Sequence, residues 1–312
     1  MKALVTGAAG FVGSHLSERL IGSGATVTGV DCFTDYYPRA LKDRNLAALR
    51  QSPGFTLVEQ PLANADLAGL LDGTTHVFHL AAQAGVRKSW GRDFHVYTVN
   101  NIEATQILLE ACVGKPIERF VYASSSSIYG DEVPLPMRED ARPQPVSPYG
   151  VTKLAAEQLC YLYHVNHSVP TVSLRYFTVY GPRQRPDMGF SRFLTAILKD
   201  ESLPMFGDGR QTRDFTFVAD AVSATVAAAT RGKLGGVYNI GGGSRVELLE
   251  VFELIRAVTG RPVKIERLES QRGDMRDTYA DTTRARTDLG FAPTVTLEQG
   301  LRAQYEWMMT GQ

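Results

Sequence analysis

The sequence of 312 residues has little cysteine, no net charge and no long apolar run, and each shortage excludes a class of protein. Its three cysteines, Cys32, Cys112 and Cys160, are far apart and form no CxxC pair, which excludes a disulfide scaffold or a zinc ribbon. Basic and acidic residues number 33 each, which argues against binding to nucleic acid or to an acidic membrane surface. No run reaches the length of a membrane span, and the N-terminus lacks the pattern of a signal peptide. We expect a cytoplasmic protein and, because the six histidines form no HExxH motif, no metal site.

What is present is the composition and pattern of an α/β protein. Apolar residues make up 44% and charged residues 21%, enough for a sizeable core. Short apolar runs alternate with helical patterns, which predicts a doubly wound parallel sheet covered on both faces. Strands are predicted at 2–6, 26–31, 56–59, 76–80, 119–123, 171–176 and 213–217, and helices at 13–23, 101–113, 189–199 and 218–229. We expect a nucleotide-binding domain at 1–170, to which about 210–240 returns, and a smaller α/β substrate lobe mainly at 171–312.

A glycine-rich turn follows the first predicted strand. The segment TGAAGFVG at 6–13 spaces Gly7, Gly10 and Gly13 as GxxGxxG and opens a helix. Such a loop lets the backbone approach a pyrophosphate, which the helix N-terminus also favours. Asp31 ends the second strand, where an acid holds adenosine ribose hydroxyls and repels a 2′-phosphate. This predicts a Rossmann-type NAD site; an ordinary glycine-rich turn with a chance aspartate is the alternative.

A tyrosine and a lysine share one face of a later helix. Tyr149 and Lys153 are four residues apart, so one lies a turn above the other. A tyrosine has an ordinary pKa of about 10, and a nearby ammonium lowers it. Tyr149 could then exchange a proton with a substrate hydroxyl, and a serine of the run 124–127, which follows a predicted strand, could bind the same oxygen. A solvated Tyr–Lys pair is the alternative.

Together these segments resemble the extended short-chain dehydrogenase/reductase family, the NAD-dependent sugar-nucleotide epimerases and dehydratases. The resemblance covers essentially the whole chain. The matching segments are 6–13, HLAAQAGVR at 79–87, YGVTK at 149–153, 175–188, 206–215 and 273–281. It implies that Tyr149 removes the proton of the sugar 4-hydroxyl while a hydride passes from C4 to NAD and later returns. NAD would thus be regenerated in each turnover and would stay tightly bound. Lys153 and Ser125 would be catalytic residues together with Tyr149. The resemblance also implies a homodimer formed through helices 101–113 and 149–164.

The resemblance also implies which residues surround the two ligands. For NAD these are Gly7, Gly10, Phe11, Val12, Gly13, Asp31, Leu62, Leu80, Ala81, Ala82, Gln83, Asn100, Lys153 and Tyr176. For the UDP-sugar they are Ser125, Ser126, Ser127, Thr178, Arg87, Arg185, Arg213, Arg272 and Asp274. Pro61 stands where many relatives have an aspartate that contacts adenine, so that contact is lost.

Finer features resemble the UDP-glucuronate 4-epimerases of the family. These are DCFTDYY at 31–37, AAQAGVR at 81–87 and Thr178. Ser126 and Ser127 replace the Asp-Glu pair of the 4,6-dehydratases, and Ser127 stands where the decarboxylases usually have glutamate. We therefore expect conversion of UDP-glucuronate to UDP-galacturonate. The alternatives are a neutral UDP-hexose 4-epimerase, a UDP-glucuronate decarboxylase and, from another class, an NAD-sensing binding protein without catalysis.

Overall fold

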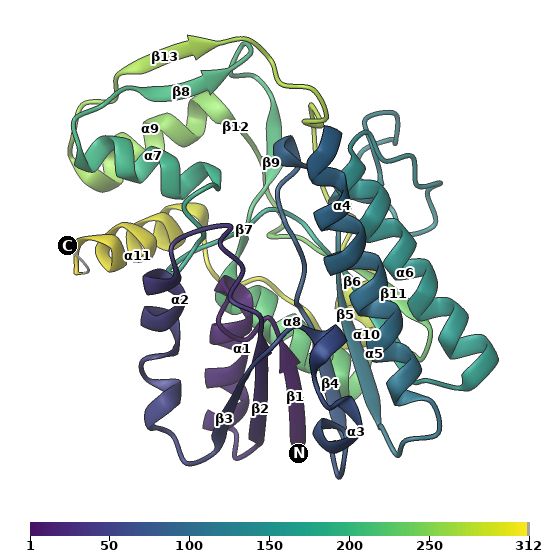
Figure 1. Ribbon diagram of the computed structural model, residues 1–312. Helices are drawn as coiled ribbons and strands as arrows, with labels where there is room; N and C mark the ends of the chain where they lie inside the picture. Colours follow the sequence, from purple (N-terminus) through teal and green to yellow (C-terminus); the bar gives the residue numbers. More distant parts are fainter. Residues whose placement is uncertain (311–312) are drawn as a thin grey trace.

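The computed structural model describes residues 1–310 and is built around one seven-stranded sheet (Figure 1). All neighbouring strands are parallel, in the order β11-β6-β5-β4-β1-β2-β3. Their bounds are β1 Lys2–Thr6, β2 Thr26–Asp31, β3 Phe55–Glu59, β4 His76–His79, β5 Arg119–Ser125, β6 Thr171–Tyr176 and β11 Gly236–Ile240. The predicted doubly wound α/β fold is confirmed.

Helices cover both faces of this sheet, because successive strand residues point to opposite sides. In β5, Val121 contributes to the apolar core beneath one set of helices, while Phe120 and Tyr122 contribute to the core beneath the other. The first set contains α1 Phe11–Gly22, α8 Val218–Arg231 and α10 Thr283–Leu289, with α2 Arg39–Leu46 beside α1. The second contains α3 Leu67–Leu70, α4 Phe94–Tyr97, α5 Ala104–Cys112 and α6 Pro148–His167.

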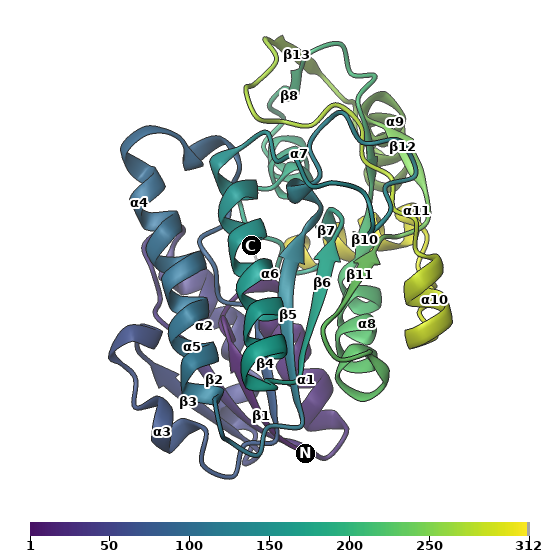
Figure 2. The ribbon, with the colours of Figure 1, turned by 90° about the vertical axis from the view of Figure 1, so that its right-hand side faces the viewer.

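The C-terminal lobe has its own apolar core and lies above the carboxyl ends of the strands (Figure 2). Its helices are α7 Gly189–Leu198, α9 Leu248–Thr259 and α11 Leu297–Met309. Its strands form pairs: β8 Leu203–Phe206 with β13 Ile265–Leu268, β9 Thr212–Asp214 with β12 Arg245–Glu247, and β7 Val179–Tyr180 with β10 Thr216–Phe217. Because β6, α8, β11 and α10 belong to the layers of the central sheet, the chain passes between the two lobes more than once. A domain boundary at residue 170 remains a prediction.

Two predicted elements differ from the structure. The single strand expected at 213–217 is wrong, because β9 and β10 are separate and pair with different strands. The fully buried Asp214 lies at this break, where it accepts hydrogen bonds from the backbone N–H groups of Gly242 and Ala280 at 2.6 and 3.1 Å. The helix expected at 101–113 begins as a π-helical segment, Thr98–Glu103, before α5.

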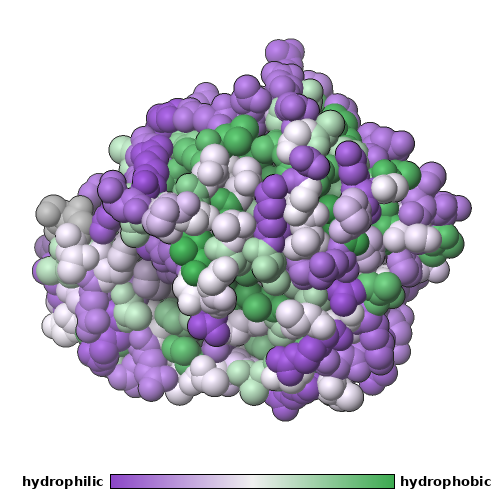
Figure 3. Space-filling model, turned by 90° about the horizontal axis from the view of Figure 1, so that it is seen from below, coloured by the Kyte–Doolittle hydropathy of each residue, from purple (hydrophilic) through white to green (hydrophobic). Residues whose placement is uncertain are grey.

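The surface seen from below Figure 1 lies at the amino-terminal ends of the sheet strands. Hydrophilic and hydrophobic side chains are interspersed on it (Figure 3). No helix within residues 1–310 is long and apolar enough to cross a membrane. The same residues contain no group of three or more His, Cys, Asp or Glu side chains that could hold a metal ion.

Candidate active site

A cavity of about 1230 Å³ opens where the carboxyl ends of the sheet strands meet the C-terminal lobe. It includes the crevice between β1 and β4, from which the strand order runs outward in both directions. In open α/β sheets, ligands bind at such a switch point. Pockets for one small ligand usually measure about 300–1,000 Å³, so this cavity has room for a dinucleotide and a second ligand together.

Most of the residues predicted from the sequence line this cavity. On the cofactor side they are Gly7, Gly10, Phe11, Val12, Gly13, Asp31, Leu62, Leu80, Ala81, Ala82, Gln83, Asn100, Lys153 and Tyr176. On the substrate side they are Ser125, Ser126, Ser127, Tyr149, Thr178, Arg87, Arg185, Arg213 and Asp274. Arg272 does not line the cavity, although its neighbours Gln271 and Gly273 do.

The glycine turn after β1 is closed tightly on itself. Gly7 has a φ of +72°, a conformation that side chains with a Cβ disfavour. A Cβ on Gly13 would lie 2.1 Å from the carbonyl oxygen of Gly7, so only glycine permits α1 to start this close to the turn. Gly10 is the N-cap of α1 and no side chain caps it. The N-terminal amides and the dipole of α1 therefore suit an anionic diphosphate, and this cradle fits a dinucleotide.

At the end of β2, Asp31 is paired with a lysine that the sequence reasoning did not assign to the site. Lys42, on α2, places Nζ 3.0 Å from Oδ1 of Asp31, and both side chains are over nine-tenths buried. Asp31 also accepts hydrogen bonds from the backbone N–H groups of Ala9 and Phe33. A carboxylate has about four acceptor positions, and three are occupied by Lys42, Ala9 and Phe33, so Asp31 keeps about one for a ribose hydroxyl. Only the packing of α2 beside β2 makes Lys42 part of this group.

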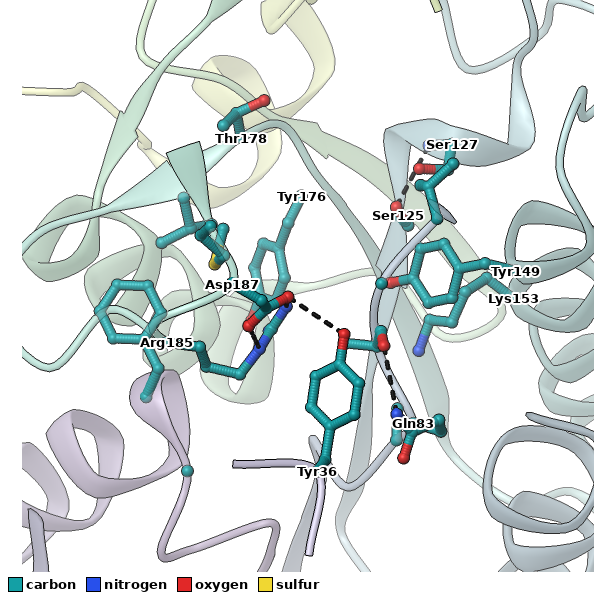
Figure 4. A pocket seen from close by; sticks show the side chains of 18 of the residues that line it. Tyr36, Gln83, Ser125, Ser127, Tyr149, Lys153, Tyr176, Thr178, Arg185 and Asp187 are labelled. Carbon is teal, nitrogen blue, oxygen red and sulfur yellow. Dashed lines mark hydrogen bonds and ion pairs between the residues drawn. The ribbon is translucent and has the colours of Figure 1, made fainter. Parts of the chain in front are cut away.

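The Tyr149 and Lys153 side chains reach the cavity from the first turns of α6. Ser147 caps this helix by accepting a hydrogen bond from the N–H of Gly150 at 3.1 Å, and Pro148 occupies its first position. The Tyr149 hydroxyl points into the cavity close to Ser125 (Figure 4). Lys153 is buried, with Nζ 4.5 Å from the ring centroid of Tyr122. The expected trio of side chains is therefore assembled at one point.

The electrostatics of this trio differ from the expectation that Lys153 lowers the pKa of Tyr149. Burial raises the pKa of Tyr149, while the neighbouring Ser125 hydroxyl and the charge of Arg185 oppose that rise. Burial also lowers the pKa of Lys153 to about 7, against the opposing influence of Cys160 and Glu157. A lysine that is only partly charged at neutral pH is a weak source of positive potential. In the chain alone, Tyr149 is therefore held in its neutral form.

A buried ion pair anchors α6 beneath these residues. Glu157 lies one turn beyond Lys153 and pairs with Arg175 of β6 at 2.7 Å, both side chains being at least 95% buried. The Ser124 hydroxyl, on β5, donates to Glu157 at 2.6 Å, and Arg175 donates to the Tyr129 oxygen at 2.7 Å. These bonds tie α6 to the two strands that carry Ser125 and Tyr176. Sequence reasoning missed them because the partners come from different elements.

Asn101, the residue next to the predicted Asn100, connects two elements beside the cavity. Asn100 lines the cavity, but its side chain donates to the carbonyl oxygen of Val96. The buried Asn101 accepts from the N–H of Gln83 at 2.7 Å and donates to Thr152 at 2.9 Å. It lies in the π-helical segment, so the altered winding there places an amide between the loop after β4 and α6.

Across the cavity from Tyr149, Arg185 forms a two-point ion pair with Asp187. The Arg185 Nε and Nη2 atoms donate to the two carboxylate oxygens at 3.0 and 3.1 Å. Tyr36, from the loop after β2, donates to the same carboxylate at 3.2 Å. Figure 4 shows this group facing Tyr149 across the cavity, with Thr178 farther along the wall. Tyr36 and Asp187 were not predicted, because their roles depend on loops that meet only in the folded chain.

At the far end of the cavity, two predicted substrate residues pair with each other. Arg87 lies 2.6 Å from Asp274, and its guanidinium stacks 4.0 Å from the ring centroid of Phe206. Arg213 also lines this end, where it donates to backbone carbonyl oxygens. The unpredicted Gln211 has a buried Oε1 with no hydrogen-bond partner among residues 1–310. This end therefore offers arginine side chains and an aromatic face, which suit a nucleoside diphosphate.

Comparisons with known proteins agree with this geometry. The model of the NAD dependent epimerase/dehydratase family matches residues 3–241. A protein described as an uncharacterized UDP-glucose epimerase, YtcB of Bacillus subtilis (strain 168), is 44% identical over 99% of this chain and 98% of its own. The UDP-glucuronate 4-epimerase of Thermodesulfobacterium geofontis (strain OPF15) is 37% identical over 97% and 95%.

A solved structure resembles the whole chain. The UDP-glucuronic acid 4-epimerase from Bacillus cereus, crystallised with UDP-glucuronic acid and NAD, has a TM-score of 0.97 and 45% identity, and both chains are covered completely. The glycine turn, Asp31, Ser125 and the Tyr149–Lys153 pair all lie on the matched chain. The chain belongs to the NAD dependent epimerase/dehydratase family.

Proposed function

We propose that the protein is an isomerase that interconverts UDP-glucuronate and UDP-galacturonate by NAD-dependent epimerisation at C4. The observation that carries the proposal is that Tyr149, a proton-transfer group, and Arg185, a partner for a carboxylate, face one cavity. The likeness to a UDP-glucuronic acid 4-epimerase over the full chain supports the same substrate.

The reaction needs a group that moves a proton at the 4-hydroxyl. Tyr149 takes this proton, and Ser125 donates a hydrogen bond to the same sugar oxygen. NAD, when bound, supplies the acceptor and later the donor of the C4 hydride, together with a positive charge that favours the phenolate. The 4-keto sugar turns within the cavity and presents its other face. Tyr149 then returns the proton to the oxygen, so no net oxidation occurs.

The residues proposed to surround the sugar favour epimerisation over two related reactions, decarboxylation and the elimination of water. The 4-keto form of glucuronate is a β-keto acid that can lose CO₂ unless its carboxylate is held. Arg185 offers a charged donor and Ser126, Ser127 and Thr178 offer neutral ones. Because serines replace the acidic side chains at 126–127, no carboxylic acid is present there to assist elimination of water.

For the cofactor, we propose that the glycine turn holds the diphosphate and Asp31 the adenosine ribose. The narrow turn and uncapped N-terminus of α1 support the first role, and the position of Asp31 at the end of β2 supports the second. Lys153, which lines the same cavity, is proposed to bind the nicotinamide ribose.

We also propose a cytoplasmic location. The free thiols of Cys32, Cys112 and Cys160 agree with it.

Asp31→Ala is expected to weaken NAD binding and to admit NADP. Removing the carboxylate leaves the buried Lys42 ammonium unpaired at the place where a 2′-phosphate would lie. The NADP/NAD affinity ratio should rise by about tenfold or more, as for one charge-assisted bond gained. Calorimetric titration with each dinucleotide measures it. In Asp31→Ala/Lys42→Ala the gain in NADP affinity should disappear; an unchanged ratio in the single variant would contradict the role of Asp31.

The function itself is tested by incubating the purified, NAD-loaded protein with UDP-glucuronate and identifying the products by NMR. UDP-galacturonate without a pentose supports the proposal. A pentose nucleotide would make the enzyme a decarboxylase. Conversion of UDP-glucose to UDP-galactose, without reaction of the glucuronate, would make it a neutral hexose epimerase. Retained NAD binding without any turnover would leave the NAD-sensing protein as the alternative.

We propose further that two copies associate through α5 and α6, which lie side by side on the outer face of the molecule (Figure 2). Apolar side chains of α6 are exposed there, Val151, Leu162 and Val165 each by 46% or more. Pairing these helices between copies would bury that face. Sedimentation should give twice the chain mass of 34.2 kDa. Leu162→Glu should yield monomers; a wild-type monomer would contradict the proposal.

A further inference from the structure

The ion pair between Arg185 and Asp187 uses only one edge of the guanidinium. Nε and Nη2 face the two carboxylate oxygens at 3.0 and 3.1 Å. Nη1 makes no hydrogen bond to any residue within 1–310. Both residues line the cavity. Arg185 therefore keeps N–H donors for a ligand while its positive charge is already paired.

Asp187 is held in this place from the other lobe. The Tyr36 hydroxyl donates to its Oδ2 at 3.2 Å, and Figure 4 shows the two side chains meeting beside Arg185. The Asp187 side chain is 29% exposed and that of Arg185 21%, so water screens the pair only in part. Asp187 is thus a fixed negative charge next to the cation that faces the sugar.

This charge acts differently on acidic and neutral sugars. A sugar carboxylate that binds Arg185 is attracted by the guanidinium and repelled by Asp187, since like charges at a few ångströms interact strongly in a partly buried site. A neutral hydroxymethyl group meets a pair with no net charge. Without Asp187, the same neutral group would leave a desolvated cation without a partner, which is costly.

Resting on the proposed function, we propose that Asp187 is a specificity-determining residue. As the resident counter-anion of Arg185, it reduces the preference of the site for UDP-glucuronate over a neutral UDP-hexose. The same cavity therefore accepts UDP-glucose as a ligand, with an affinity that Asp187 maintains.

The test measures binding in the NAD-loaded Tyr149→Phe protein, where turnover does not interfere. Calorimetry gives Kd for UDP-glucose and for UDP-glucuronate, and the quantity of interest is their ratio. Asp187→Asn keeps the shape of the side chain and removes its charge. We expect it to raise the UDP-glucose/UDP-glucuronate Kd ratio by about tenfold, with Asp187→Ala acting in the same direction.

Two controls separate this effect from others. Asp208→Asn removes an equal charge from another part of the cavity wall, beside Arg276, and should leave the ratio unchanged. In an Arg185→Ala background, Asp187→Asn should no longer alter the ratio. An unchanged or lower ratio in Asp187→Asn overturns the proposal, since a residue that only positions Arg185 would weaken UDP-glucuronate binding. Failure of the wild-type protein to form UDP-galacturonate would instead refute the proposed function, whatever the ratio.

Discussion

Tyr149→Phe is expected to lower kcat for 4-epimerisation by about 100-fold to 10,000-fold, the range contributed by a positioned acid–base group. The substitution removes only the hydroxyl that exchanges the proton. The ring, which lies 6.3 Å from that of Tyr97 between centroids, should keep its packing. Affinities for NAD and UDP-glucuronate should change little, because the lost interaction acts in the transition state. Steady-state rates and calorimetry measure both quantities.

A matched control is available on the same helix. Tyr161→Phe removes an equivalent hydroxyl from a residue of α6 that is 57% exposed, and should leave kcat unchanged. Burial raises the pKa of Tyr149 above its ordinary value, so a positive charge near the ring, which bound NAD would supply, favours the phenolate. A Tyr149→Phe protein that retains activity within tenfold of wild type would show that another group moves the proton.

Glu157→Ala is expected to lower the free energy of unfolding by about 3–5 kcal/mol. The substitution leaves the Arg175 guanidinium buried without its counter-charge, and it removes the acceptor of the Ser124 hydroxyl. Urea denaturation followed by circular dichroism measures the loss. Because α6 is then released from β5 and β6, kcat should fall as well, through displacement of Tyr149 and Lys153.

The control for this prediction is an exposed pair. Glu298→Ala disrupts the Glu298–Arg302 pair on α11, whose side chains are about half exposed, and should cost less than about 1 kcal/mol. Replacing both Glu157 and Arg175 by methionine should recover part of the stability, since no unpaired charge remains. Equal losses from Glu157→Ala and Glu298→Ala would contradict the anchoring role of the buried pair.

Interactions between residues close in sequence were predictable from the sequence. The glycine turn, the helix that follows it and Asp31 lie within the first 31 residues, in one strand–helix–strand unit. Tyr149 and Lys153 are joined by a single helical turn. Short apolar runs that alternate with helical patterns predicted the layered sheet, because strands buried on both faces are apolar along their length. The short motifs, in their order, then indicated the family, which the comparisons confirm.

The tertiary structure decided which charges face one another. Arg175 pairs with Glu157, Lys42 with Asp31 and Arg185 with Asp187, and none of these pairings could be read from the local sequence patterns. The buried Asp214, at the end of β9, likewise accepts hydrogen bonds from amides that distant segments bring to it.

The pKa of Lys153 also could not be predicted from the sequence. Its pKa of about 7 arises from burial beneath the cavity, which reverses the simple expectation of a fully charged lysine beside Tyr149. The sequence by itself determined the fold, the family and the candidate chemical groups, because these depend on local pattern. Partners, pKa values and the balance of charge around the sugar were decided by the tertiary structure, because they depend on desolvation and on contacts between distant segments.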